Sequence, residues 1–305
     1  MTNPTLILGT AFWAWTIDAP RAFQLLDAYY EAGFRWIDCA TNYPINKNPA
    51  DFRGAEKILL AWIKSNGIDD LSILMKIGSV NNLHTPTNNL TPSFMHIMLQ
   101  EYRFLFGSQL RQWMIHWDNR EDPTAISQTL EAMQAAQDLG LQLGLSGIKY
   151  PHLYAQINTA FSFDFDIQIK HNLLYSDYSR YVDFHGKRRF LTYGMNAGGL
   201  KFQAEDYHAL SATLVRGVEA EKHQPYLGQI QQMLALYNQG SKRKPIEHFH
   251  QCSMVFSFYS PEIKAMLIGP STLSQLAQSI TFYGELRQGY HRPLFDHLLK
   301  WKSNA

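Results

Sequence analysis

Several short apolar runs in this sequence end in residues whose side chains can move a proton. Among these residues are an acid, a lysine and a histidine: Asp38, Lys76 and His116. Tyr43 follows five residues after Asp38, in the segment that leaves the same run. A tyrosine has a pKa of about 10, so it is a poor acid near neutral pH unless a cation stabilises its phenolate. We expect Lys76 to supply that cation and to lower the pKa of Tyr43.

Together these four side chains could protonate a carbonyl oxygen as it becomes an alcohol. Asp38 would hold the Lys76 ammonium in place, and His116 would donate a hydrogen bond that orients the substrate oxygen towards Tyr43. The group contains no source of hydride, so a cofactor must supply one. The alternative is that strand ends are polar because they meet water, which explains one such residue more easily than the set.

Short apolar runs and longer amphipathic segments alternate along the chain, and this alternation predicts the strands and helices that position these residues. Eight short runs suit buried parallel strands, at residues 6–8, 36–37, 73–75, 113–115, 143–145, 166–169, 190–193 and 266–268. Segments with helical spacing lie at residues 22–32, 56–65, 122–139, 246–259 and 273–283. Eight alternations predict an α/β fold, a closed (β/α)8 TIM barrel, with residues 1–305 as one domain. The strand ends would then meet at one mouth of the barrel.

Two segments fall outside this alternation of strands and helices. Residues 201–225 are too long for a simple connection, and we expect them to form an insertion or lid over one face of the barrel. Residues 287–305 follow the eighth unit, and we expect a C-terminal extension made of a loop and a helix.

Composition and charge exclude several classes of protein. A net charge of +1 is too balanced for a nucleic-acid or membrane-surface binder, and a hydrophobic share of 46% is too high for a disordered chain. No apolar stretch approaches the roughly 18 residues that a membrane helix needs. The start lacks a secretory signal and two cysteines make no disulfide framework, so we expect a cytoplasmic protein. We expect a monomer, with a homo-oligomer as the alternative.

The order of motifs along the chain resembles that of the aldo-keto reductase family. From Leu6 to Ser279 the matching pieces are LILGTAFW, GFRWIDCATNY, GAEKILLAWI, ILMKIG, MIHWD, GLSG, DIQIKHNLLY, LTYGMNAGGL and MLIGPSTLSQLAQS. The resemblance implies a (β/α)8 barrel that reduces an aldehyde or ketone, sugar-like ones included, with NADPH, or alternatively NADH. It assigns Tyr43 as the general acid, with Lys76, Asp38 and His116 in the roles described above.

The resemblance also assigns residues to the nicotinamide end of the cofactor. Gly9 and Thr10 match the turn beneath the cofactor. Ser146 and Gln168 match the positions that hold the nicotinamide carboxamide, and Tyr193 matches the ring that stacks on the nicotinamide.

At the other end of the cofactor, the resemblance assigns the adenosine 2′-phosphate to the start of a helix, where anions are favoured. Ser271, Thr272 and Gln275 match that segment. Many members carry an arginine near Gln275 and a Glu-Asn pair at Gln278 and Ser279. The absence of a cation at Gln275 leaves the choice between NADP and NAD open.

The substrate pocket is the part of the site that the sequence describes least. Trp13 and Trp117 lie beside mouth motifs, and we expect both to form pocket wall. Gly147 stands where the family usually has an asparagine that contacts the carboxamide. The loops at residues 44–53, 78–91, 119–122 and 201–225 would decide the substrate, which the sequence leaves open together with the direction of reaction.

Two other functions are compatible with parts of the sequence. A regulatory or redox-sensing subunit could keep the barrel and bind nucleotide with slow turnover, although the intact set of four residues argues against it. His248-Phe249-His250 resembles the paired histidines of barrel metallohydrolases. Because this pair lies in a helical segment, we expect its side chains to point in different directions, and we expect no metal.

Overall fold

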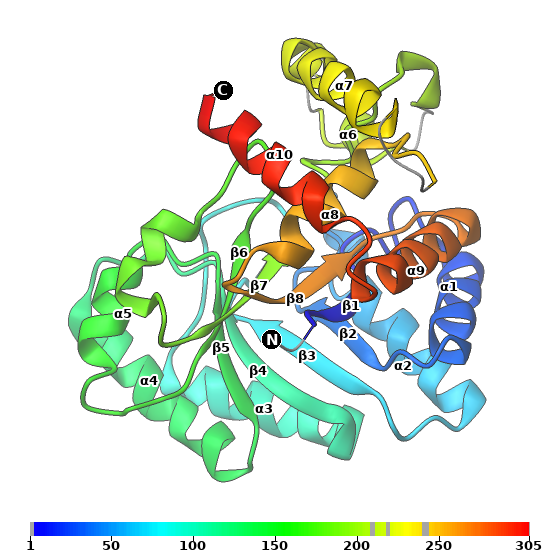
Figure 1. Ribbon diagram of the computed structural model, residues 1–305. Coiled ribbons are helices and arrows are strands. Elements are labelled where there is room, and N and C mark those ends of the chain that lie inside the picture. The colour runs from blue at the N-terminus through cyan, green and yellow to red at the C-terminus, as the bar shows by residue number, and fades with distance from the viewer. Residues whose placement is uncertain (1–2, 208–210, 218–219, 240–243, 305) are drawn as a thin grey trace.

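A closed barrel of eight parallel strands forms the centre of the protein in a computed structural model (Figure 1), which describes residues 3–207, 211–217, 220–239 and 244–304. Each strand pairs with its neighbour in sequence order, and β1 closes onto β8. The predicted (β/α)8 barrel is therefore confirmed. The strands are β1 (Thr5–Gly9), β2 (Trp36–Ala40), β3 (Ser72–Ile77), β4 (Leu110–His116), β5 (Gln142–Ser146), β6 (Asp166–Lys170), β7 (Arg189–Tyr193) and β8 (Ile263–Ile268).

Helices surround the barrel and connect successive strands (Figure 1). The connection between β6 and β7 carries a 3-10 helix, η3 (Tyr178–Phe184), so one of the eight expected alternations lacks its α-helix. The α-helices are α1 (Ala19–Glu31), α2 (Gly54–Asn66), α3 (Pro92–Phe106), α4 (Pro123–Asp138), α5 (Pro151–Ile157), α6 (Ala212–Val215), α7 (Gln224–Gln239), α8 (Phe249–Tyr259), α9 (Leu273–Arg287) and α10 (Arg292–Asn304).

The alternation of side chains along each strand places the polar residues inside the barrel mouth. Leu74 and Met114 are fully buried in the barrel interior. Lys76 and His116 follow them two residues later, so they lie on the same inner face, one step nearer the carboxyl end. The inner apolar layer therefore forms a floor beneath the polar residues of the mouth.

Described residues of the long segment after β7 line part of this mouth, and the segment continues into peripheral helices. It contains η4 (Ala204–Asp206), α6 and η5 (Ala220–His223), while residues 208–210 and 218–219 lie outside the described part of the chain. Figure 1 shows α6 and α7 projecting from the barrel beyond α8.

The expected C-terminal helix is α10, and it is fastened to the strand-end side of the barrel. Lys302 donates hydrogen bonds to the backbone oxygens of Asn172 and Leu173, at 3.1 and 2.6 Å. In the described part of the chain, every helix is too short or too polar to cross a lipid bilayer.

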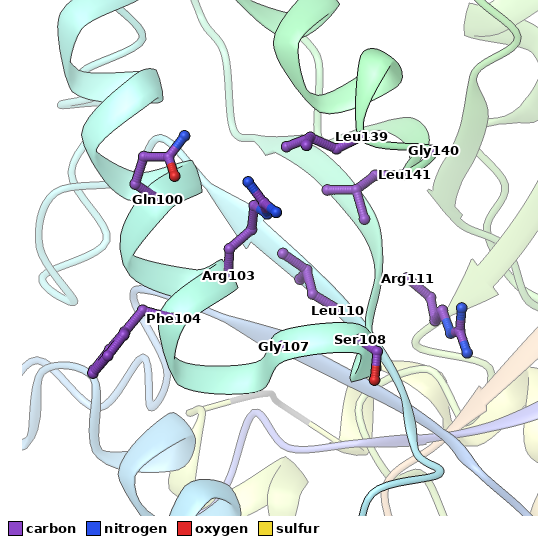
Figure 2. A pocket seen from close by; sticks show the side chains of 10 residues that line it. All are labelled: Gln100, Arg103, Phe104, Gly107, Ser108, Leu110, Arg111, Leu139, Gly140 and Leu141. Atoms are coloured by element: carbon purple, nitrogen blue, oxygen red, sulfur yellow. The ribbon is translucent and has the colours of Figure 1, made fainter.

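A surface hollow at the opposite end of the barrel lies between the end of α3 and the start of β4 (Figure 2). Its volume is about 690 Å³. Figure 2 shows Arg103 extending towards Leu139 and Leu141, whereas Phe104 points away from the hollow. Because catalytic residues of TIM barrels lie at the carboxyl ends of the strands, this hollow is not the candidate active site.

Candidate active site

A cavity of about 460 Å³ opens at the carboxyl ends of the strands, and we call it the strand-end cavity. Seven of the eight strands contribute a lining residue at or near their last position, and segments after β7 and β8 form the remaining walls. Its lining includes ten of the residues predicted from the sequence: Gly9, Asp38, Tyr43, His116, Trp117, Ser146, Gln168, Tyr193, Ser271 and Gln275.

A buried chain of hydrogen bonds forms part of the cavity floor. Lys76 Nζ donates to both carboxylate oxygens of Asp38, each at 2.5 Å. Gln168 Nε2 donates to Asp38 Oδ1 at 2.7 Å, and Ser146 Oγ donates to Gln168 Oε1 at 2.9 Å. The Lys76 and Asp38 side chains are 0% and 2% exposed, so each charge depends on the other for its neutralisation. The chain fixes the rotamers of four predicted site residues.

Tyr43 lies above this ion pair with its ring close to both Lys76 and His116. Lys76 Nζ is 4.9 Å from the centroid of the Tyr43 ring, and the Tyr43 and His116 rings meet edge to face with their centroids 5.9 Å apart. The side chains expected to act together are therefore neighbours around one point of the cavity.

Burial is the largest influence on the acidity of Tyr43, and the lowering of its pKa by Lys76 stays a prediction. Burial raises the pKa of Tyr43 well above its ordinary value of 10.0, and the Asp38 carboxylate raises it further. The Lys76 ammonium lies over the ring and gives its hydrogen bonds to Asp38. Tyr43 therefore holds its proton across the neutral range, which is the state that a proton donor requires.

His116 is held in its neutral form. Burial lowers the pKa of His116 well below its ordinary value of 6.5, and the charge of Lys76 adds to this effect. Its Nδ1 atom is buried and has no hydrogen-bond partner among the described residues. A neutral imidazole can donate from one ring nitrogen only, so His116 is suited to give a single hydrogen bond to a substrate oxygen.

We expect the rate of reduction to show no ionisation of His116 between about pH 6 and pH 8. A lowered pKa means that His116 has already lost its proton below this range. The measurement is kcat against pH for the wild type and for His116→Gln, whose amide can still donate. An inflection near pH 6.5 in the wild type that disappears in His116→Gln would contradict a neutral His116.

The residues assigned to the nicotinamide line the strand-end cavity, and the glycine beside Ser146 depends on Trp117. Tyr193, whose pKa is raised by burial, lines the cavity together with Ser146 and Gln168. Gly147 has φ +67°, and a Cβ atom there would lie 2.5 Å from Cδ1 of Trp117. The usual asparagine therefore cannot occupy this position while Trp117 keeps its place in the pocket wall.

The segment assigned to the 2′-phosphate caps its own helix. Thr272 Oγ1 accepts a hydrogen bond from Gln275 N at 3.2 Å, which makes Thr272 the N-cap of α9. Gln275 Oε1 accepts from Ser271 N at 2.8 Å. The Gln275 side-chain oxygen is thus used within the protein, and its amide NH₂ group is left to face the cavity.

Four predicted residues do not line the cavity, each for a physical reason. Lys76 lies beneath Asp38, and Thr272 is the α9 cap. Thr10 is fully buried and donates to the backbone oxygen of Asp38 at 2.9 Å. The expectation that Trp13 forms pocket wall is wrong, because Trp13 is 1% exposed and packs in the core. Its neighbour Phe12 lines the cavity in its place.

Sequence reasoning missed a cation of the lining, Arg216, and placed the paired histidines wrongly. His248 and His250 both line the cavity, and their rings stack with centroids 5.4 Å apart, so they do not point in different directions. Burial lowers the pKa of His250 to about 4. Within the described ranges no group of three or more histidine, cysteine, aspartate or glutamate side chains could hold a metal ion. Arg216 follows a long connection whose path no local pattern predicts.

Comparison with known proteins gives two findings. The model of the aldo/keto reductase family matches residues 5–286, which is nearly the whole barrel. The "uncharacterized 11.2 kDa protein in crtE 3′ region" of Pseudescherichia vulneris is 33% identical over 82 residues, covering 25% of this chain and 76% of that protein.

Proposed function

This chain belongs to the aldo/keto reductase family, and from that premise we propose that it reduces an aldehyde or ketone, sugar-like ones included, to an alcohol with NADPH. Family membership itself makes the chain an oxidoreductase that acts on small carbonyl compounds. The observation that carries the finer proposal is the arrangement of Tyr43 and His116 above the Lys76–Asp38 pair in one cavity.

Tyr43 acts as the proton donor. An alkoxide is more basic than a phenolate, so a tyrosine with a raised pKa still gives up its proton to an oxygen that is becoming an alkoxide. Lys76 then lies close enough to the ring to stabilise the phenolate that remains. Asp38 acts as a positioning residue because its carboxylate binds the Lys76 ammonium.

His116 orients the carbonyl. Its neutral ring donates a hydrogen bond at the place where negative charge develops, and it does so without adding a second full cation beside Lys76. Trp117 packs against the His116 ring, with centroids 4.7 Å apart, and this contact restrains the imidazole. His116 therefore presents a fixed hydrogen-bond donor to the substrate.

The residues present fit a nicotinamide nucleotide. When bound, the nicotinamide supplies hydride to the carbonyl carbon. Ser146 and Gln168 would hold its carboxamide and Tyr193 would stack on its ring, while Gly9 and Thr10 form the turn below. Asn196 Oδ1, on the cavity wall, is buried and has no hydrogen-bond partner among the described residues, so it can accept one from a bound molecule.

Fluorescence titration with NADPH and with NADH tests the cofactor, and carbonyl-dependent oxidation of the bound nucleotide tests the reaction. We expect saturable NADPH binding and turnover of simple aldehydes. A clear preference for NADH would overturn the choice of cofactor. Tight binding without turnover over a broad carbonyl panel would indicate a regulatory subunit, and binding of neither nucleotide would refute the proposed function.

We expect Gln275→Arg to increase the preference for NADPH over NADH by about tenfold, or about 1.4 kcal/mol. The wild type offers amides and hydroxyls around Gln275, whereas a guanidinium adds a charge-assisted hydrogen bond to the 2′-phosphate. The measurement is the ratio of dissociation constants for the two nucleotides. The matched control, Gln275→Met, keeps the length of the side chain and should not raise the ratio. An unchanged ratio in Gln275→Arg would place the 2′-phosphate elsewhere.

A further inference from the structure

Arg216 lies at the edge of the strand-end cavity, on the segment that follows β7. Its guanidinium carbon is 4.4 Å from the centroid of the Phe12 ring, and both residues line the cavity. The positive charge of Arg216 lowers the pKa of Tyr43, which opposes the effect of burial. The charge of Arg216 also interacts with Tyr193. This cation therefore sits at the carbonyl-reducing end of the cavity.

Two other charged side chains of the cavity wall have hydrogen-bond partners within the protein. Asp38 is paired with Lys76, and Lys201 Nζ donates to the backbone oxygen of Asp206 at 2.6 Å. Among the ion pairs and hydrogen bonds of the described residues, none involves Arg216. Its forked set of donors suits a carboxylate or a phosphate, both of which accept two parallel hydrogen bonds.

The position of Arg216 indicates which bound molecule would carry the anion. Ser271 and Gln275 mark the end assigned to the 2′-phosphate, whereas Arg216 interacts with Tyr43 and Tyr193 at the end where the carbonyl reacts. The contact of the guanidinium with the Phe12 ring also restrains the Arg216 side chain at the cavity edge. A negative group on the substrate, a few bonds from its carbonyl, would then contact the Arg216 guanidinium.

We propose that Arg216 selects carbonyl substrates that carry an anionic group, a carboxylate in the first instance, and that it binds this group at the cavity edge. This inference rests on the proposed function, since it names a class of substrate for the same site. Arg216 is a specificity-determining residue here and takes no part in the proton transfer.

Two aldehydes that share the same ring and differ in the charge of one substituent test the proposal: 4-carboxybenzaldehyde and its neutral methyl ester. We expect the wild type to prefer the acid, and Arg216→Met to lose about 10- to 100-fold in kcat/KM for the acid, as expected for a charged hydrogen bond. The ester should lose less than threefold, because methionine keeps apolar contact with Phe12. Arg216→Lys should recover part of the preference for the acid, since it keeps the charge without the fork.

Three further measurements separate the alternatives. Arg103→Met, in the hollow between α3 and β4, is the matched control for loss of a cation and should leave both rates unchanged. Equal losses in kcat/KM for the acid and the ester in Arg216→Met would overturn the proposal. A fall in NADPH affinity large enough to explain the loss for the acid would also overturn it, because Arg216 would then contact the cofactor. If an aldehyde that carries a phosphate has a higher kcat/KM than the carboxylate, the preferred anionic group is a phosphate and Arg216 keeps its role.

If the wild type reduces the acid and the ester equally well, this inference fails and the proposed function stands. If it reduces neither aldehyde although NADPH binds, the proposed function fails first.

Discussion

Tyr43→Phe is expected to lower kcat by about 10²- to 10⁴-fold while leaving the affinity for NADPH within about threefold of the wild type. The substitution removes only the hydroxyl, which has no hydrogen-bonded partner among the described residues, and it keeps the ring that packs beside Lys76 and His116. Single-turnover oxidation of bound NADPH by an aldehyde measures the chemical step directly. A fluorescence titration of the same preparation measures cofactor binding.

The matched control for this variant is Tyr30→Phe. Its hydroxyl donates to Asp70 at 2.9 Å on the surface, far from the cavity, so its loss should leave kcat within about twofold. If Tyr43→Phe kept more than a tenth of the wild-type kcat, Tyr43 would not be the acid. A matching fall in NADPH affinity would assign the loss to binding instead.

Lys76→Met is expected to lower the free energy of unfolding by about 3–5 kcal/mol, because it leaves the Asp38 carboxylate buried without its cation. Only the Gln168 amide and the polar cavity floor would remain to stabilise that charge. Urea denaturation at neutral pH measures the loss. Activity should fall as well, since the phenolate of Tyr43 would lose its neighbouring ammonium.

Two further variants test whether the loss of stability comes from the unpaired Asp38 charge or merely from the loss of a lysine side chain. Lys64→Met, on the exposed face of α2, should change stability by less than about 0.5 kcal/mol. Combining Lys76→Met with Asp38→Leu removes both charges and should recover most of the stability but none of the activity. A single Lys76→Met variant as stable as the wild type would show that Asp38 does not depend on the pair.

The barrel could be predicted from the sequence because short apolar runs alternate with amphipathic segments, and polar residues lie at or near the ends of several of these runs. The same pattern located Asp38, His116, Ser146 and Gln168, since the side-chain alternation of a strand carries the inner face to the mouth. Helix α4 could also be predicted, because Asp122 accepts a hydrogen bond from Ala125 N and Pro123 occupies the first turn.

Features that depend on tertiary contacts could not be predicted. Which of Phe12 and Trp13 faces the cavity depends on how the turn after β1 folds, and Trp13 enters the core. The glycine at position 147 is explained by the Trp117 ring, which comes from another strand end. Arg216 reaches the cavity from beyond β7 through a connection without a regular pattern, so only the three-dimensional arrangement brings it into the lining beside Phe12.

The most direct test of the central claim follows the hydrogen that the carbonyl carbon receives. The protein is incubated with an aldehyde and with NADPH deuterated at the carbon that donates hydride, and the product is analysed by mass spectrometry. The account predicts one alcohol for each NADPH oxidised, with one deuterium on the former carbonyl carbon, and almost none of this product with Tyr43→Phe. Tight NADPH binding without labelled alcohol from any aldehyde would contradict it.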